Sequence, residues 1–197
     1  DDGVEFFGGA GSLKNVIVAN VGDDSLDYDE GWPGKVQYLF AMQGIPGTGA
    51  DKSDKRGEHD GGNSPDSSQP FAIPTIYNAT YVGQGNNKAI TGGGTNTGLQ
   101  FRDNAGGRYY NSALLDFAGA SVLMEGGSYP AGSPTGANTS GERAATAYSA
   151  ILDGELYQQP ASDFQLELQN NTFWCIGRQE SSDVAALGRE LTLSTTG

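Results

Sequence analysis

The stretch that decides the fold is residues 1–22, "DDGVEFFGGAGSLKNVIVANVG", because residues 23–44, "DDSLDYDEGWPGKVQYLFAMQG", repeat it without a gap. Both copies begin with Asp-Asp, carry glycine at their ninth and last positions, and place apolar residues alike, so that Ile17 falls beside Leu39. A period of about twenty residues, with short β-rich runs and Gly/Asp turns, is typical of a solenoid in which each repeat forms one coil. The repeat therefore predicts stacked strands.

Each copy predicts two strands. The first, "GVEFF" or "SLDYD", alternates, so that Val4 and Phe6 point to one face while Glu5 and Phe7 point to the other. The second, "NVIVAN" or "QYLFAM", is a short apolar run that is suited to burial in a stacked parallel sheet. β-branched and aromatic residues are common in both runs, which favours strands over helices.

The same two-strand pattern returns later in the chain with interruptions. Its later copies are "KRGEHD" (55–60), "IYNATYVG" (76–83), "TGLQFRD" (97–103), "YYNSALLDF" (109–117), "ASVLMEG" (120–126) and "LELQNNTFWCIG" (166–177). Residues 45–73 and 127–160 are rich in Gly, Ser, Pro and Asn, which predicts two long loops. We therefore expect an all-β, right-handed parallel β-helix that forms one domain over residues 1–197 and is part of a longer chain.

An asparagine recurs next to the second strand of several copies. The four positions are Asn15, Asn78, Asn111 and Asn171. Asparagine tolerates turn conformations, and stacked asparagines can form hydrogen bonds between coils through their amides. The recurrence predicts a corner that is stacked from coil to coil.

The phrases "DDGVEFFGG…KNVIVANVGDDSLDYDEGW", "RGEHD" and "IYNATYVG" resemble a group of bacterial secreted or surface-attached right-handed parallel β-helix proteins. The resemblance covers most of residues 1–125 and, more faintly, residues 150–177. It implies the β-helix fold and an extracellular or cell-surface location. It brings no established catalytic activity with it.

Composition narrows the range of partners. A net charge of −13 argues against binding to nucleic acid, which requires a basic face. No run of apolar residues is long enough to span a membrane. The single cysteine, Cys175, excludes an internal disulfide, and its apolar neighbours predict a buried thiol.

Five acidic residues crowd the segment "GDDSLDYDEG" (22–31). Neighbouring strands lie about 4.8 Å apart, so Glu5, Asp27 and Glu58 would form a ladder of carboxylates on successive coils. One interpretation is a solvated acidic face that lysines, arginines and counterions relieve. The second is a Ca²⁺ site, because calcium accepts about six to eight oxygen ligands in irregular geometry. Its candidate ligands are Glu5, Asp24, Asp27, Asp29 and Glu58.

The third interpretation is catalytic. "GDDS" (22–25) is similar to the adjacent aspartates of β-helix glycosidases of the polygalacturonase type, which makes Asp23 and Asp24 candidates. The basic and histidine motifs of such an enzyme are not found in the sequence, and Asp-Asp is also a good turn sequence. His59, the only histidine, is the one candidate for a general base near neutral pH, although its acidic neighbours predict a surface position.

Two aromatic residues near the acidic segment are candidates for stacking on a sugar. Phe7 points outward in the predicted strand, and Trp32 lies in a Gly/Pro turn. The sequence favours a noncatalytic extracellular module with a structural, adhesive or glycan-binding role, stabilised by calcium. The alternatives are a polysaccharide lyase or glycoside hydrolase that uses the acidic face, and a subunit that stacks with another copy through its open ends.

Overall fold

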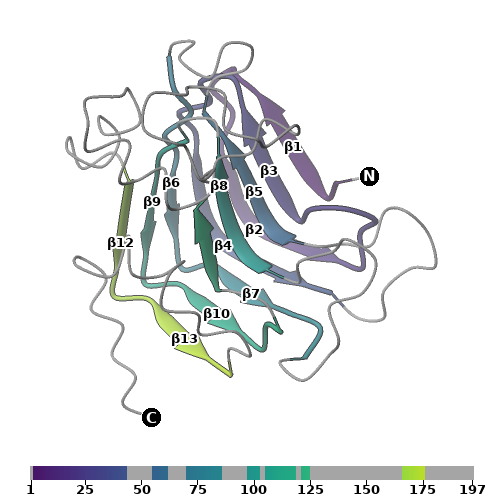
Figure 1. The fold of residues 1–197 in the computed structure, drawn as a ribbon. Helices are drawn as coiled ribbons and strands as arrows, with labels where there is room; N and C mark the ends of the chain where they lie inside the picture. The colour runs from purple at the N-terminus through teal and green to yellow at the C-terminus, as the bar shows by residue number, and fades with distance from the viewer. Residues whose placement is uncertain are drawn as a thin grey trace, which may run out of the picture.

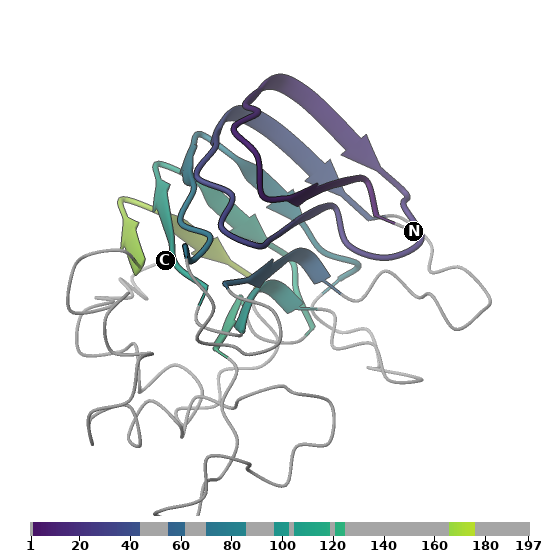
Figure 2. The same ribbon diagram turned by 90° about the horizontal axis from the view of Figure 1, so that it is seen from above.

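The structure is a parallel β-helix whose coils stack in chain order from the N-terminal strands to the last one (Figure 1, Figure 2). The computed structural model describes residues 2–43, 55–61, 70–85, 97–102, 105–118, 121–124 and 166–175. Thirteen strands form within these ranges, and every strand pair is parallel. The predicted parallel β-helix is thus confirmed. None of these residues forms a helix with the length and apolarity needed to cross a bilayer.

One strand from each of five coils forms the first sheet, here called sheet A. Its strands follow one another in the order β1 (Val4–Phe7), β3 (Leu26–Asp29), β5 (Lys55–Asp60), β8 (Thr97–Arg102) and β11 (Val122–Met124). Each repeat contributes its first predicted strand to sheet A. The strand β5 is the predicted copy "KRGEHD" and interrupts the long loop predicted over residues 45–73, while residues 127–160 lie outside the described residues.

The second sheet, sheet B, is bent into two legs. Strands β2 (Leu13–Ala19) and β4 (Lys35–Met42) run through both legs, whereas the later coils divide into two shorter strands each. On the first leg these are β6 (Thr75–Tyr77), β9 (Gly107–Tyr110) and β12 (Leu166–Gln169), and on the second leg β7 (Thr80–Val82), β10 (Ala113–Leu115) and β13 (Thr172–Trp174).

The corner between the two legs is a stack of residues in the left-handed backbone conformation. Their φ angles lie between 53° and 60°, a region that asparagine enters more readily than most residues. The stack comprises Asn15, Tyr38, Asn78, Asn111 and Asn170. The predicted corner is therefore present, but its last member is Asn170 and not Asn171. The Asn171 amide instead accepts a hydrogen bond from the Ser112 N–H and donates one to the Tyr109 carbonyl.

The first two coils are offset by 22 residues in sheet A but by 23 residues in sheet B. Val4 pairs with Leu26, an offset of 22, but Ile17 pairs with Phe40, an offset of 23, so the predicted pairing of Ile17 with Leu39 is wrong. The additional residue lies in the turn of the second coil that contains Trp32. A shift of one residue exchanges the two faces of a strand, so it decides which side chains of β4 enter the core.

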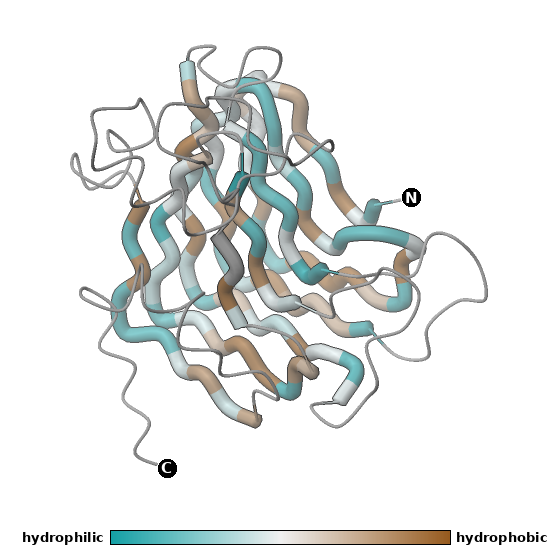
Figure 3. The backbone as a smooth tube through the Cα atoms, in the orientation of Figure 1, coloured by the Kyte–Doolittle hydropathy of each residue, from teal (hydrophilic) through white to brown (hydrophobic). Residues whose placement is uncertain are grey.

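The core lies inside the coils, where alternate residues of every sheet meet. Figure 3 shows apolar and polar residues alternating along several strands. Leu26, Leu39, Ile76 and Tyr109 are completely buried there. Trp32 closes one end of this core: its ring stacks on Phe6 with centroids 4.2 Å apart, and its Nε1–H donates to the Gly11 carbonyl at 3.0 Å.

Candidate functional site

The predicted ladder of carboxylates exists on the outer face of sheet A. Glu5 pairs with Asp27, Asp27 with Glu58, and Glu58 with Gln100, so one outward position is polar over four coils. Arginine and lysine side chains contact the third member. Glu58 Oε1 lies 3.0 Å from Lys55 Nζ and 2.7 Å from Arg102 Nη1. Arg102 also pairs with the Asp60 carboxylate.

These contacts divide the ladder electrostatically. Burial, followed by the charge of Glu58, raises the pKa of Asp27 from 3.8 to about 8. Burial alone would also raise the pKa of Glu58, but the charges of Lys55 and Arg102 outweigh it and lower that pKa. The cations therefore stabilise the charge of Glu58, whereas the charge of Asp27 is destabilised where it lies.

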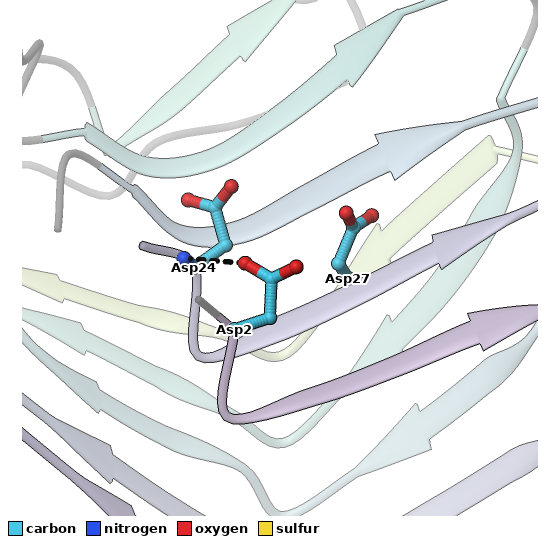
Figure 4. A group of neighbouring side chains, drawn as sticks. All are labelled: Asp2, Asp24 and Asp27. Carbon is cyan, nitrogen blue, oxygen red and sulfur yellow. Dashed lines mark hydrogen bonds between the residues drawn. The ribbon is translucent and has the colours of Figure 1, made fainter. Parts of the chain in front are cut away.

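Three carboxylates meet where the chain enters β1 and β3 (Figure 4). One oxygen each of Asp2, Asp24 and Asp27 lies within 4.8 Å of the others, and we call this group the carboxylate triad. Asp2 Oδ1 accepts a hydrogen bond from the Asp24 N–H at 2.9 Å, which joins the two turns. Asp24 itself is buried.

The triad overlaps the predicted calcium ligands only in part. Asp24 and Asp27 were predicted and are brought together, while the predicted ligands Glu5, Asp29 and Glu58 are not members of the triad. Asp2 was missed as a ligand. The sequence did contain a signal for it, because Asp2 and Asp24 are equivalent residues of the 22-residue repeat and lie at the same place on adjacent coils.

His59 is a core residue, so the predicted surface position is wrong. Its ring is completely buried and stacks on Tyr28 with centroids 4.0 Å apart. The Tyr109 O–H donates to His59 Nε2 at 2.5 Å. Burial lowers the pKa of His59 to about 3, which leaves the imidazole neutral at neutral pH. Such a ring cannot reach a substrate on the outside of the coils. Of the other catalytic candidates, Asp24 belongs to the triad and Asp23 lies half-buried in the turn before it.

The two aromatic candidates for ligand binding differ completely in exposure. Phe7 is exposed on the outer face of sheet A, next to Asp29 on the following coil. Trp32 is fully buried, so the prediction that it stacks on a ligand is wrong. The Gly/Pro turn that suggested an exposed ring instead folds the indole inward over Phe6. Cys175 is a second correction of this kind, because its thiol is exposed.

All strands of sheet A, and the strands of sheet B up to β10, lie within the part of the chain that a known family covers. Residues 1–145 match the family described as the pectate-lyase-like β-helix domain. The chain belongs to this family. No curated protein and no solved structure matches it. The match takes in sheet A and the carboxylate triad, while β12 and β13 lie beyond it.

In this member of the pectate-lyase-like β-helix family, the first leg of sheet B presents two outward rows of polar and aromatic residues. We call them together the tyrosine face. The rows, in order of the coils, are Lys14, Gln37, Tyr77, Tyr110 and Gln169, and beside them Lys35, Thr75, Arg108 and Glu167. The rings of Tyr77 and Tyr110 stack with centroids 4.9 Å apart, and the Tyr110 O–H donates to Glu167. Tyr110 was among the aromatic residues visible in the sequence, but Tyr77 was missed.

The second leg of sheet B presents an outer face without any charge, which we call the apolar face. The residues of its two outward rows are Ile17, Phe40, Thr80, Ala113 and Thr172, and Ala19, Met42, Val82, Leu115 and Trp174. Ile17, Phe40, Met42 and Trp174 are exposed. The apolar run "QYLFAM" was predicted to be buried, and this is wrong for its outward residues Phe40 and Met42.

Proposed function

We propose that the protein is a noncatalytic extracellular or cell-surface module that binds a glycan chain along the tyrosine face. The observation that carries this proposal is the stacked pair Tyr77 and Tyr110, which stands on an exposed part of the β-helix among amide and charged side chains. Aromatic rings offer flat apolar surfaces to the C–H faces of sugars, and they lose little conformational freedom on binding.

The neighbours of the tyrosines supply the polar half of such a site. Gln37 precedes Tyr77 in the same row, and Gln169 follows Tyr110. Planar amides and carboxylates can pair with two adjacent hydroxyls, which gives a sugar site its orientation. Because neighbouring coils are about 4.8 Å apart, the same kinds of group recur along the helix axis, as a chain of repeating units requires.

The charge of the tyrosine face favours an acidic glycan. Lys14, Lys35 and Arg108 all lie on this face, although the whole chain carries 24 acidic and only 11 basic residues. A local group of cations on a protein of net charge −13 attracts an anion to that face alone. The resemblance to secreted and surface-attached β-helix proteins supports a location outside the cell.

Binding is tested by calorimetry with soluble polygalacturonate as the acidic probe and hydroxyethyl cellulose as the neutral one, both in EDTA so that no metal bridges protein and probe. We expect the acidic probe to bind and Tyr77→Ala to weaken it about tenfold, as for the loss of a central aromatic contact. Trp174→Ala, which removes an exposed ring from the apolar face, is the matched control. Unchanged affinity in Tyr77→Ala, or an equal loss in Trp174→Ala, would disprove the assignment.

The enzyme alternative has one observation in its favour, and it concerns a different face. The pKa values of Asp27 and Glu58 are moved in opposite directions on adjacent coils, which is how a carboxylic acid and a carboxylate are paired in glycoside hydrolysis. Both side chains are buried, and Glu58 contacts two cations, which favours the noncatalytic assignment. New reducing ends or unsaturated products from either polysaccharide, lost in Asp27→Asn, would establish the enzyme instead.

A further inference from the structure

We propose that the carboxylate triad of Asp2, Asp24 and Asp27 binds one calcium ion, which fastens the first coil of the β-helix to the second. The proposal does not depend on glycan binding, because the triad lies on sheet A and the tyrosine face lies on sheet B. It replaces the five-residue ligand set predicted from the sequence with three residues, one of which was not in that set.

The spacing of the triad suits a single cation. One oxygen from each carboxylate lies within 4.8 Å of the other two. An ion that contacts all three at the Ca–O distance of about 2.3–2.6 Å would hold them no farther apart than about twice that distance, so no rearrangement of the coils is needed. Three carboxylates supply three to six oxygens, and water can complete a coordination number of about six to eight.

Asp27 provides the second, independent observation. It is only 9% exposed, and its Oδ1 atom is buried and accepts no hydrogen bond from the described residues. A buried carboxylate oxygen without a partner is costly, and buried charges in proteins are as a rule paired or bound to a metal. Asp27 therefore shows the feature expected of a metal ligand.

Two basic side chains of the following coils are already engaged by another carboxylate. Lys55 and Arg102 contact the Glu58 carboxylate, at 3.0 Å and 2.7 Å, and this neutralises the ladder one coil beyond Asp27. With Asp27 deprotonated, the state that a bound cation favours, the triad carries three negative charges. A divalent cation leaves a single negative charge, and a hard ion with oxygen ligands matches the chemistry of the three donors.

The position of the triad explains what the ion would stabilise. Strand β1 pairs with β3 in sheet A, beside the triad. The backbone bonds from Gly3 N–H to Asp24 O and from Val4 N–H to Ser25 O hold the start of β1 against the start of β3. An ion shared by Asp2 from the first coil and by Asp24 and Asp27 from the second would reinforce this contact and make the two coils less prone to separate.

The test is thermal unfolding of the whole chain, first stripped with EDTA and then with 1 mM calcium chloride. We expect calcium to raise the unfolding midpoint by about 5 °C or more, as for a ligand that binds only the folded state at a concentration well above its Kd. Titration calorimetry with calcium alone should give one site per chain. A midpoint that calcium leaves unchanged, together with no heat of binding, would overturn the proposal.

Two variants locate the site. Asp27→Asn keeps the shape of the side chain but removes its charge, so it should abolish the calcium shift while leaving the midpoint in EDTA unchanged or raised. Asp29→Asn is the matched control, because Asp29 lies on the same face of the same strand, is also 9% exposed, and is outside the triad. It should retain the calcium shift. An equal loss in both variants, or a shift retained in Asp27→Asn, would contradict the proposed ligand set.

Discussion

Sheet A and the second leg of sheet B are built from the same coils, yet their outer faces follow opposite rules. On sheet A, the outward residues Asp27, Glu58 and Asp60 are charged and buried. On the second leg, the outward residues are uncharged and mostly apolar, and Ile17 is 76% exposed. Soluble proteins usually cover apolar groups and expose charged ones. The β-helix inverts this arrangement on two of its faces.

The inversion has a different physical consequence on each face. Charges that are removed from water must be compensated, and on sheet A the contacts of Glu58 with Lys55 and Arg102 do so. Apolar groups left in water need no such partners, so the second leg has no equivalent network among its described residues. Similar substitutions on the two faces should therefore lower the free energy of unfolding by different amounts.

The largest expected effect is on the outer face of sheet A, which we call the charged face. Glu58→Gln keeps the shape of the side chain but removes the charge that Lys55 and Arg102 contact, so two cations remain close together in a largely buried place. Breaking such a pair by neutralising one partner should lower the free energy of unfolding by about 3 kcal/mol. Urea denaturation at pH 7 measures the change.

Glu5→Gln is the matched control for this variant, because Glu5 lies in the same row of the ladder, two coils away. It is exposed and belongs to no ion pair in the described residues. Its cost should remain within about 0.5 kcal/mol, as for an ordinary surface substitution. Equal costs for Glu5→Gln and Glu58→Gln would show that burial of the charged face contributes nothing to stability.

The sequence was sufficient for the register of the first two strands of sheet A, because the 22-residue repeat and the alternation of "GVEFF" and "SLDYD" determine it independently. It was not sufficient for sheet B. One additional residue in the turn around Trp32 changes the offset to 23, and nothing in the turn sequence shows that the indole packs inward on Phe6. The position of this ring depends on a residue from the preceding coil, which periodicity does not reveal.

The candidate site was predicted in part for a related reason. The stacking of Glu5, Asp27 and Glu58 follows from register alone and was predicted correctly. The burial of His59 follows from the alternation of inward and outward residues along a strand, because His59 pairs with Tyr28, which points inward on the preceding coil. The acidic neighbours of His59 in the sequence suggested a surface position instead. Local composition was misleading where the alternation of the strand was the better guide.

The second prediction uses His59 as a probe of the core beneath the charged face. Because burial lowers its pKa from 6.5 to about 3, the unfolded chain binds more protons than the folded one between these pH values. The contribution of His59 to the free energy of unfolding should therefore fall by about 2 kcal/mol between pH 6.5 and 4.5, while the raised pKa of Asp27 contributes in the opposite direction, so the effect of His59 is the difference between wild type and a variant without it. Urea denaturation across this range measures the slope for the wild type and for His59→Phe.

His59→Phe removes the titrating group, so over this pH range the wild type should lose about 2 kcal/mol more of its free energy of unfolding than His59→Phe does. Tyr109→Phe is the control: it deletes the hydroxyl that donates to His59 Nε2 but keeps the imidazole, so the slope should persist even though the protein is less stable. If wild type and His59→Phe lost stability in parallel, the histidine would not be buried in the neutral form, and the core of sheet A would be more hydrated than the structure indicates.

The smallest expected effect is on the apolar face, and it tests the other half of the comparison. Ile17 and Val18 are adjacent in β2 and point to opposite sides, with exposures of 76% and 6%. Ile17→Thr should change the free energy of unfolding by no more than about 0.5 kcal/mol, because little apolar surface is withdrawn from water there. Val18→Thr places a hydroxyl in the core and should cost about 1–3 kcal/mol. If the two substitutions lower the free energy of unfolding equally, the apolar face is covered in solution. The contrast between the two outer faces would then come from a contact of the apolar face that the described residues do not include, and not from the coils themselves.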